Sequence, residues 1–264
     1  MEFKRFREII IRNREYEKDV KESLKIFHDR VQWDGDIPKI MKEIGRKLDV
    51  FIIEIPMNDP EFGAVFLETG YSKYLLLNSN QPRNKMYFSF CHDIYHILNG
   101  TPDYINEKRE VHLNQDYTFN DNEGKANLFA ANLLMPEVEF KKMYELYRED
   151  NNSIEIIVAK LMNYFSSTFV AVLIRLYELN ILQKIDAVKN LLEYNNNDVE
   201  KLFDKLWLDK EILKPSLKDE MPFVFEMLND EGTKLIQEQL ISEYNFNKII
   251  ERIKILYSKI RLEK

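Results

Sequence analysis

The chain has 264 residues, of which 45% are hydrophobic and 31% are charged, and its formal net charge is −7. This globular balance supplies enough apolar material for one large core or two modest ones, and the acidic charge argues against nucleic acid as a primary partner. A single cysteine, Cys91, excludes an intramolecular disulfide, and no apolar run reaches the roughly 20 residues that cross a membrane. We therefore expect a cytoplasmic protein that binds neither nucleic acid nor membrane directly.

The scarcity of glycine and proline indicates a mostly helical chain. Residues 1–32 predict a charged helix or a pair of helices, and the cluster from Trp33 to Pro38 predicts a break after them. Asp36 can cap a short helix that continues to about Leu48, because apolar residues recur there at helical spacing.

Three short β-rich runs follow, at Val50–Ile55, Ala64–Leu67 and Tyr74–Leu77. Asparagine, aspartate, proline and glycine residues separate these runs, as is typical of turns between strands. We therefore expect a small antiparallel sheet in this part of the chain.

Residues 83–98 are apolar on nearly every face and predict a buried helix. After a polar stretch, Asn120 and Asp121 can cap a second helix that runs to Leu134. Further helices are expected over residues 137–149, 154–164 and 167–180. The amphipathic region 184–264 is also expected to be helical, with breaks at Asn195–Asn197, Pro215 and Asp230–Gly232.

These elements predict a mostly helical α+β fold with three parts. Residues 1–35 form an N-terminal helical extension, residues 36–183 form the domain that contains the sheet, and residues 184–264 form an all-helical C-terminal domain.

Two of the four histidines, His92 and His96, stand four residues apart inside the most buried predicted helix. Residues i and i+4 share one helical face, so both imidazoles can bind the same metal ion. Asp93 has the position of the general base in His-Glu-x-x-His peptidases. The alternative is a pair of ordinary core histidines beside a hydrogen-bonded aspartate.

Glu123 is the best candidate for a third ligand, because it continues the core-facing stripe of the helix that ends at Leu134. Asn127 lies four residues later on the same side and can accept the free ring N–H of one metal-bound histidine. In the alternative interpretation, Glu123 only favours the positive N-terminus of its helix.

The runs FSFCHDIYH, from Phe88 to His96, and EGKANLFAANLLMP, from Glu123 to Pro136, resemble the ImmA/IrrE metallo-endopeptidase family. That family has a His-Glu-x-x-His helix and then a Glu-x-x-Ala-Asn-x-Phe-Ala-x-x-Leu-Leu-Met-Pro helix. The similarity extends over about residues 36–183.

The resemblance implies a zincin-like helix pair in which His92, His96 and Glu123 bind Zn²⁺ and Asp93 replaces the catalytic glutamate. It also implies hydrolysis of a specific protein, typically an Xre-type helix-turn-helix repressor that controls a stress response or a mobile genetic element. Because aspartate is one methylene shorter than glutamate, a metal-binding regulator that has lost peptidase activity is the main alternative. An interaction protein without a metal, which works through its helical C-terminal region, is a second alternative.

Three residues of the polar stretch between the two metal helices are weaker candidates for stabilising an oxyanion. These are Tyr104, His112 and Tyr117.

Overall fold

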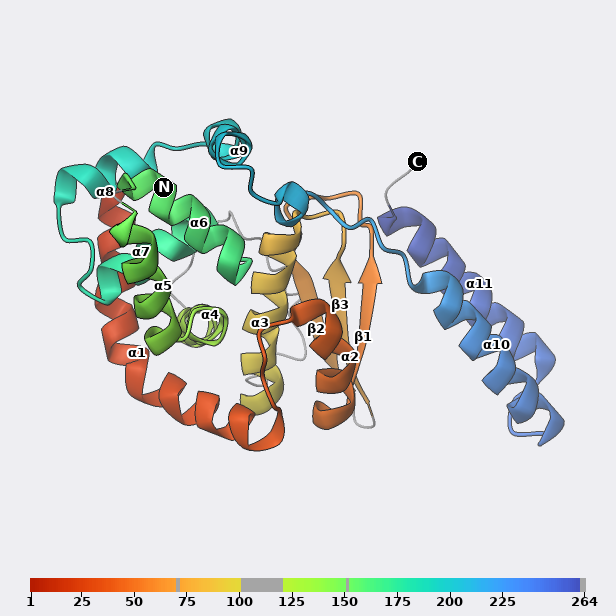
Figure 1. Ribbon diagram of the computed structural model, residues 1–264. Helices are drawn as coiled ribbons and strands as arrows, with labels where there is room; N and C mark the ends of the chain where they lie inside the picture. The colour runs from red at the N-terminus through yellow and green to blue at the C-terminus, as the bar shows by residue number, and fades with distance from the viewer. Residues whose placement is uncertain (70–71, 101–120, 151, 262–264) are drawn as a thin grey trace.

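The computed structural model describes the whole chain except residues 70–71, 101–120, 151 and 262–264. It confirms a mostly helical α+β protein with one small sheet (Figure 1). The buried helix predicted over residues 83–98 lies in the middle of the molecule, between the sheet and a group of helices.

The N-terminal segment is one continuous helix, α1 (Phe3–Arg30), and not a pair of helices. Its buried side chains recur at helical spacing and face the rest of the core. Helix α2 (Ile37–Leu48) begins where the sequence predicts, because the Asp36 carboxylate accepts a hydrogen bond from the backbone N–H of Lys39.

The sheet contains three strands, β1 (Val50–Ile55), β2 (Ala64–Glu68) and β3 (Lys73–Asn78), in the order β1-β3-β2. Strand β2 pairs antiparallel with β3, but β1 pairs parallel with β3. The prediction of an antiparallel sheet is therefore wrong for β1, and the sheet is mixed. After β1, the chain skips the neighbouring position in the sheet and forms β2 one position further away. Strand β3 then fills the gap between β1 and β2.

The side chain of Asn78, at the end of β3, holds the loop that makes this crossing. Its Oδ1 accepts from the N–H of Met57 at 3.0 Å, and its Nδ2 donates to the carbonyls of Asp59 at 2.7 Å and Phe62 at 2.8 Å. Asn78 is fully buried, so these bonds satisfy a polar group that would otherwise cost free energy in the core. The loop between β1 and β2 is thereby fixed to the strand it passes.

Helix α3 (Arg83–Asn99) covers the sheet and packs on its other side against α4 (Asp121–Leu134). Both helices have the bounds expected from the sequence to within a residue. The remaining elements are α5 (Glu137–Glu149), α6 (Ile154–Phe165), α7 (Phe169–Glu178), α8 (Ile185–Leu192), α9 (Asn196–Lys205), the 3₁₀ helix η1 (Lys210–Leu213), α10 (Met221–Gln237) and α11 (Glu243–Ile260).

Helices α10 and α11 form a hairpin that extends from the β1 side of the molecule (Figure 1). The predicted break at Asp230–Gly232 is wrong, because α10 runs through it without interruption. A Cβ at Gly232 would stand 2.0 Å from Cε2 of Phe246 on α11. Gly232 therefore allows α10 and α11 to pack closely and does not end a helix.

One cluster of buried hydrophobic residues extends from α1 to η1 and includes Phe6, Val188 and Phe203. A smaller cluster joins the hairpin to β1 through Met221, Ile55 and neighbouring residues. The predicted division at residues 35/36 and 183/184 stays a prediction. Among the described helices no single one is long and apolar enough to cross a membrane, and α6 and α7, which would reach that length together, meet at 107°.

Candidate metal centre

Helix α3 brings the rings of His92 and His96 together on its buried face. The two side chains are nearly inaccessible to solvent, and their Nε2 atoms lie 3.2 Å apart. The spacing of four residues produces this convergence, since one helical turn separates the two positions.

Helix α4 adds Glu123 to the pair, as the sequence predicts. Oε2 of Glu123 lies 3.1 Å from Nε2 of His92, and Oε1 lies 3.4 Å from Nε2 of His96. One potential ligand atom from each residue lies within 4.8 Å of the other two. Two nitrogens and a carboxylate in this arrangement are a donor set that suits Zn²⁺ and leaves a fourth tetrahedral position open.

The hydrogen bond of His92 supports the fit to a metal ion. Nδ1 of His92 lies 2.9 Å from Oδ1 of Asn127. Because an amide oxygen can only accept, Nδ1 carries the proton and the Nε2 of a neutral ring keeps its lone pair for a metal. Two ligands bound to one tetrahedral ion at about 2.0–2.1 Å are roughly 3.3 Å apart, which agrees with the 3.2 Å between the Nε2 atoms.

The charges of the cluster are strongly coupled. Burial would raise the pKa of Glu123, but hydrogen bonds from His92 and His96 outweigh burial and hold it well below its usual range. Burial would lower the pKa of His92, but the hydrogen bond to Glu123 and the charge of Asp93 raise it. Glu123 is therefore a carboxylate at neutral pH, as a metal ligand must be.

Asp93 is buried beside the cluster, with 2% of its surface exposed. Burial raises the pKa of Asp93 to about 6, although the two histidines oppose that shift. Among the described residues, no hydrogen bond to its carboxylate contributes to this value. A carboxylate with a pKa near neutrality can both accept and return a proton, which is the requirement for a general base.

The ends of α3 are fixed by segments that sequence reasoning did not connect with the site. At its start, the Arg83 backbone N–H and side chain bond the carbonyl of Lys214, and the guanidinium pairs with Glu211 at 3.1 Å. At its end, the Ser23 hydroxyl of α1 donates to Oδ1 of Asn99 at 3.2 Å. No sequence signal could find these contacts, because the partners lie 76 or more positions away.

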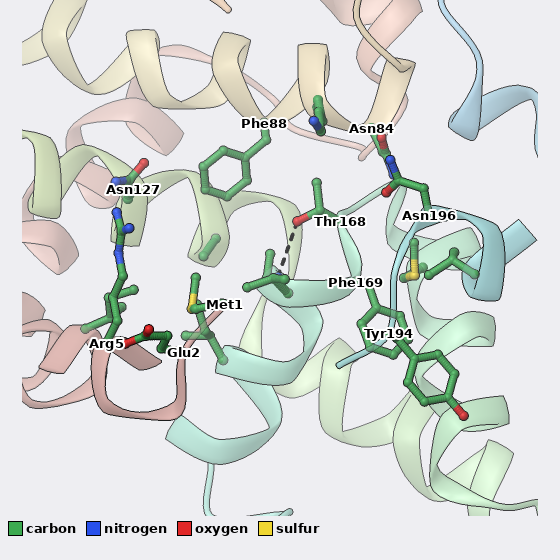
Figure 2. A pocket seen from close by; sticks show the side chains of 18 of the residues that line it. Met1, Glu2, Arg5, Asn84, Phe88, Asn127, Thr168, Phe169, Tyr194 and Asn196 are labelled. Atoms are coloured by element: carbon green, nitrogen blue, oxygen red, sulfur yellow. Dashed lines mark hydrogen bonds between the residues drawn. The ribbon is translucent and has the colours of Figure 1, made fainter. Parts of the chain in front are cut away.

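A cavity of about 1010 Å³ (Figure 2) is lined by Asn127 but by none of His92, Asp93, His96 and Glu123. Phe88 of α3, Arg5 of α1 and Thr168, which caps the start of α7, also line it. The cavity therefore reaches the residue that bonds His92 Nδ1, on the side of that ring which faces away from Glu123.

Cys91 and the candidates for stabilising an oxyanion stand apart from the ligand set. Cys91 is fully buried, and burial raises the pKa of its thiol well above the usual range, so it stays protonated and unreactive. Tyr104, His112 and Tyr117 lie outside the described residues.

The comparisons with known proteins agree with this geometry. A model of the IrrE N-terminal-like domain of the M78 peptidases matches residues 46–177, which is half of the chain and includes every residue of the cluster. No curated protein matches the chain.

Proposed function

Because the chain belongs to the IrrE N-terminal-like family of M78 peptidases, we propose that it is a zinc-dependent endopeptidase that cleaves a specific protein. The observation that carries this proposal is the convergence of His92, His96 and Glu123 beside the buried Asp93. The first three side chains match the donor set of a catalytic zinc site, and the fourth matches its general base.

The residues of the chain have separate tasks in this reaction. His92, His96 and Glu123 would hold the ion, which would supply a Lewis acid for the scissile carbonyl and lower the pKa of water. Asp93 takes a proton from the attacking water and returns it to the leaving amine. Asn127 keeps the ring of His92 in the tautomer that leaves Nε2 free.

The substrate that we propose is an Xre-type helix-turn-helix repressor of a stress response or a mobile genetic element. A protein substrate is supported by the α10–α11 hairpin, on which large apolar side chains such as Phe223, Tyr244 and Leu256 are more than half exposed. Large contiguous patches of exposed apolar groups are typical of protein-binding surfaces. We therefore place recognition of the substrate in residues 184–264 and hydrolysis in residues 36–183.

The second candidate function is a metal-binding regulator without peptidase activity, and the identity of Asp93 favours it. The aspartate side chain is one methylene shorter than the glutamate of His-Glu-x-x-His sites, so its carboxylate lies closer to the backbone of α3. Both candidates predict zinc binding, and only the endopeptidase predicts turnover.

Cleavage of a candidate Xre-type helix-turn-helix repressor distinguishes the two functions. Wild type, Asp93→Asn and Asp93→Glu are compared at equal zinc loading by gel and mass spectrometry, with the exposed Asp29→Asn as a matched control. We expect Asp93→Asn to abolish cleavage, because an amide cannot accept the proton, and Asp93→Glu to keep or raise it. Cleavage that survives in Asp93→Asn would eliminate Asp93 as the base. No cleavage by any of the four proteins would favour the regulator.

A further inference from the structure

The first turn of α4 carries Glu123 and is less supported by the helix itself than the interior of α4 is. The first four backbone N–H groups of a helix have no carbonyl partner within it, so a first turn opens more readily than the interior. A metal ligand in this position needs side chains from another element to fix its direction.

Helix α1 supplies such side chains on both sides of Glu123. The hydroxyl of Tyr16 donates to Oδ1 of Asp121 at 2.7 Å. Nζ of Lys125 contacts Oδ2 of Asp19 at 2.5 Å. The turn is therefore tied to α1 two residues before the ligand and two residues after it.

Gly124, which directly follows the ligand, makes room for this contact. Glycine is disfavoured inside helices, so its presence in α4 calls for a packing reason. A Cβ at position 124 would stand 2.5 Å from Cε2 of Tyr16. The buried ring of Tyr16 lies where that Cβ would be, so the same residue makes both a steric and a polar contact with the turn.

We propose that Tyr16 and Asp19 are positioning residues of the metal centre, which hold the first turn of α4 so that Glu123 faces His92 and His96. The inference rests on the proposed function, because it takes Glu123 to be a metal ligand.

Helix α1 lies before the residues that the family domain matches, 46–177. This chain therefore completes the support of its metal centre with a helix from outside that domain. Partners that orient a metal ligand typically account for 10–100-fold in metal affinity. We expect an effect of that order from the removal of the Tyr16 side chain.

The experiment measures zinc affinity and local opening in the full-length protein. Zinc affinity is obtained by competition with a chromophoric chelator for wild type, Tyr16→Ala and Tyr16→Phe. Hydrogen exchange of the amides of residues 121–125 is measured in the metal-free proteins. Asn13→Ala is the matched control, because Asn13 also lies on α1 but donates at 2.5 Å to Glu178 on α7.

We expect Tyr16→Ala to weaken zinc binding 10–100-fold and to speed exchange at 121–125, with a smaller effect for Tyr16→Phe, which keeps the ring. Asn13→Ala should lower the unfolding temperature but leave both readings at the wild-type value. The inference is overturned if both Tyr16 variants bind zinc like wild type, or if Asn13→Ala weakens binding as much.

The two proposals fail in different ways. A wild-type protein that binds no zinc overturns the metal centre and any positioning of a ligand within it. A wild-type protein that binds zinc, combined with variants of unchanged affinity, overturns only the role of α1. If Tyr16→Ala does not fold, Tyr16→Phe decides through the same two readings, because it removes only the hydroxyl.

Discussion

The hydrogen bond between His92 and Asn127 offers a direct test of the metal centre. Replacing Asn127 by leucine keeps the branching and approximate size of the side chain but removes the acceptor of the Nδ1–H. His92 is buried, so its Nδ1–H would lose the protein acceptor that it now has.

The expected loss of zinc affinity can be estimated in two ways. A buried donor without a partner costs about 1–3 kcal/mol, and removing the partner of a metal-bound histidine costs about 10–100-fold in metal affinity. The second range corresponds to about 1.4–2.7 kcal/mol, so the two agree. If the ring instead moves its proton to Nε2, the lone pair that faces Glu123 is lost and binding weakens further.

Competition with a chromophoric chelator measures this loss. Asn127→Asp should bind zinc at least as tightly as wild type, because a carboxylate is a stronger acceptor for the Nδ1–H. Asn132→Leu is the control on the same helix, since Nδ2 of Asn132 donates only to the Leu128 carbonyl, at 2.8 Å. Wild-type affinity in Asn127→Leu would refute the reasoning, because the bond could not then be what fixes the histidine.

Three further predictions follow from the ligand set and the packing. His96→Ala should abolish zinc binding, and Glu123→Gln should weaken it strongly while the protein stays soluble. Metal analysis after dialysis measures both effects, and full zinc content in either variant would contradict the ligand set. Gly232→Ala should destabilise the protein by about 1–3 kcal/mol in denaturant unfolding, because its Cβ would overlap Phe246, and Phe246→Ala should relieve the effect. A chain that ends at residue 183 should unfold at a lower temperature than the full chain, because α8 and α9 contribute buried residues to the main core; an unchanged midpoint would support a separate C-terminal domain.

Local signals explain which parts of the structure the sequence predicts well. The i, i+4 spacing of His92 and His96 and the apolar stripe after Glu123 encode directions within single helices. Two helices that pack along those stripes then bring the three side chains together. The start of α2 is equally local, because its cap is a single side chain.

The features that the sequence does not predict depend on partners far away along the chain. The direction of β1 relative to β3 follows from the direct pairing of two strands that β2 separates in the sequence, which no pattern within either strand encodes. Glycine is typical of helix breaks, and only the position of Phe246 shows that Gly232 lies at a close contact between two helices. The role of Tyr16 is similarly invisible, because a tyrosine on a charged helix gives no sign of which helix it faces.

The attachment of α3 to the segment around Lys214 has a consequence for synthesis of the protein. A nascent chain contains all three proposed zinc ligands once Glu123 has been made, but the contacts of Arg83, at the start of the helix that carries two of them, with Glu211 and Lys214 must wait. Those residues come about 90 positions later, which takes roughly 5–18 s at ~5–20 residues per second. A ribosome-bound chain therefore lacks this support of α3 during that interval.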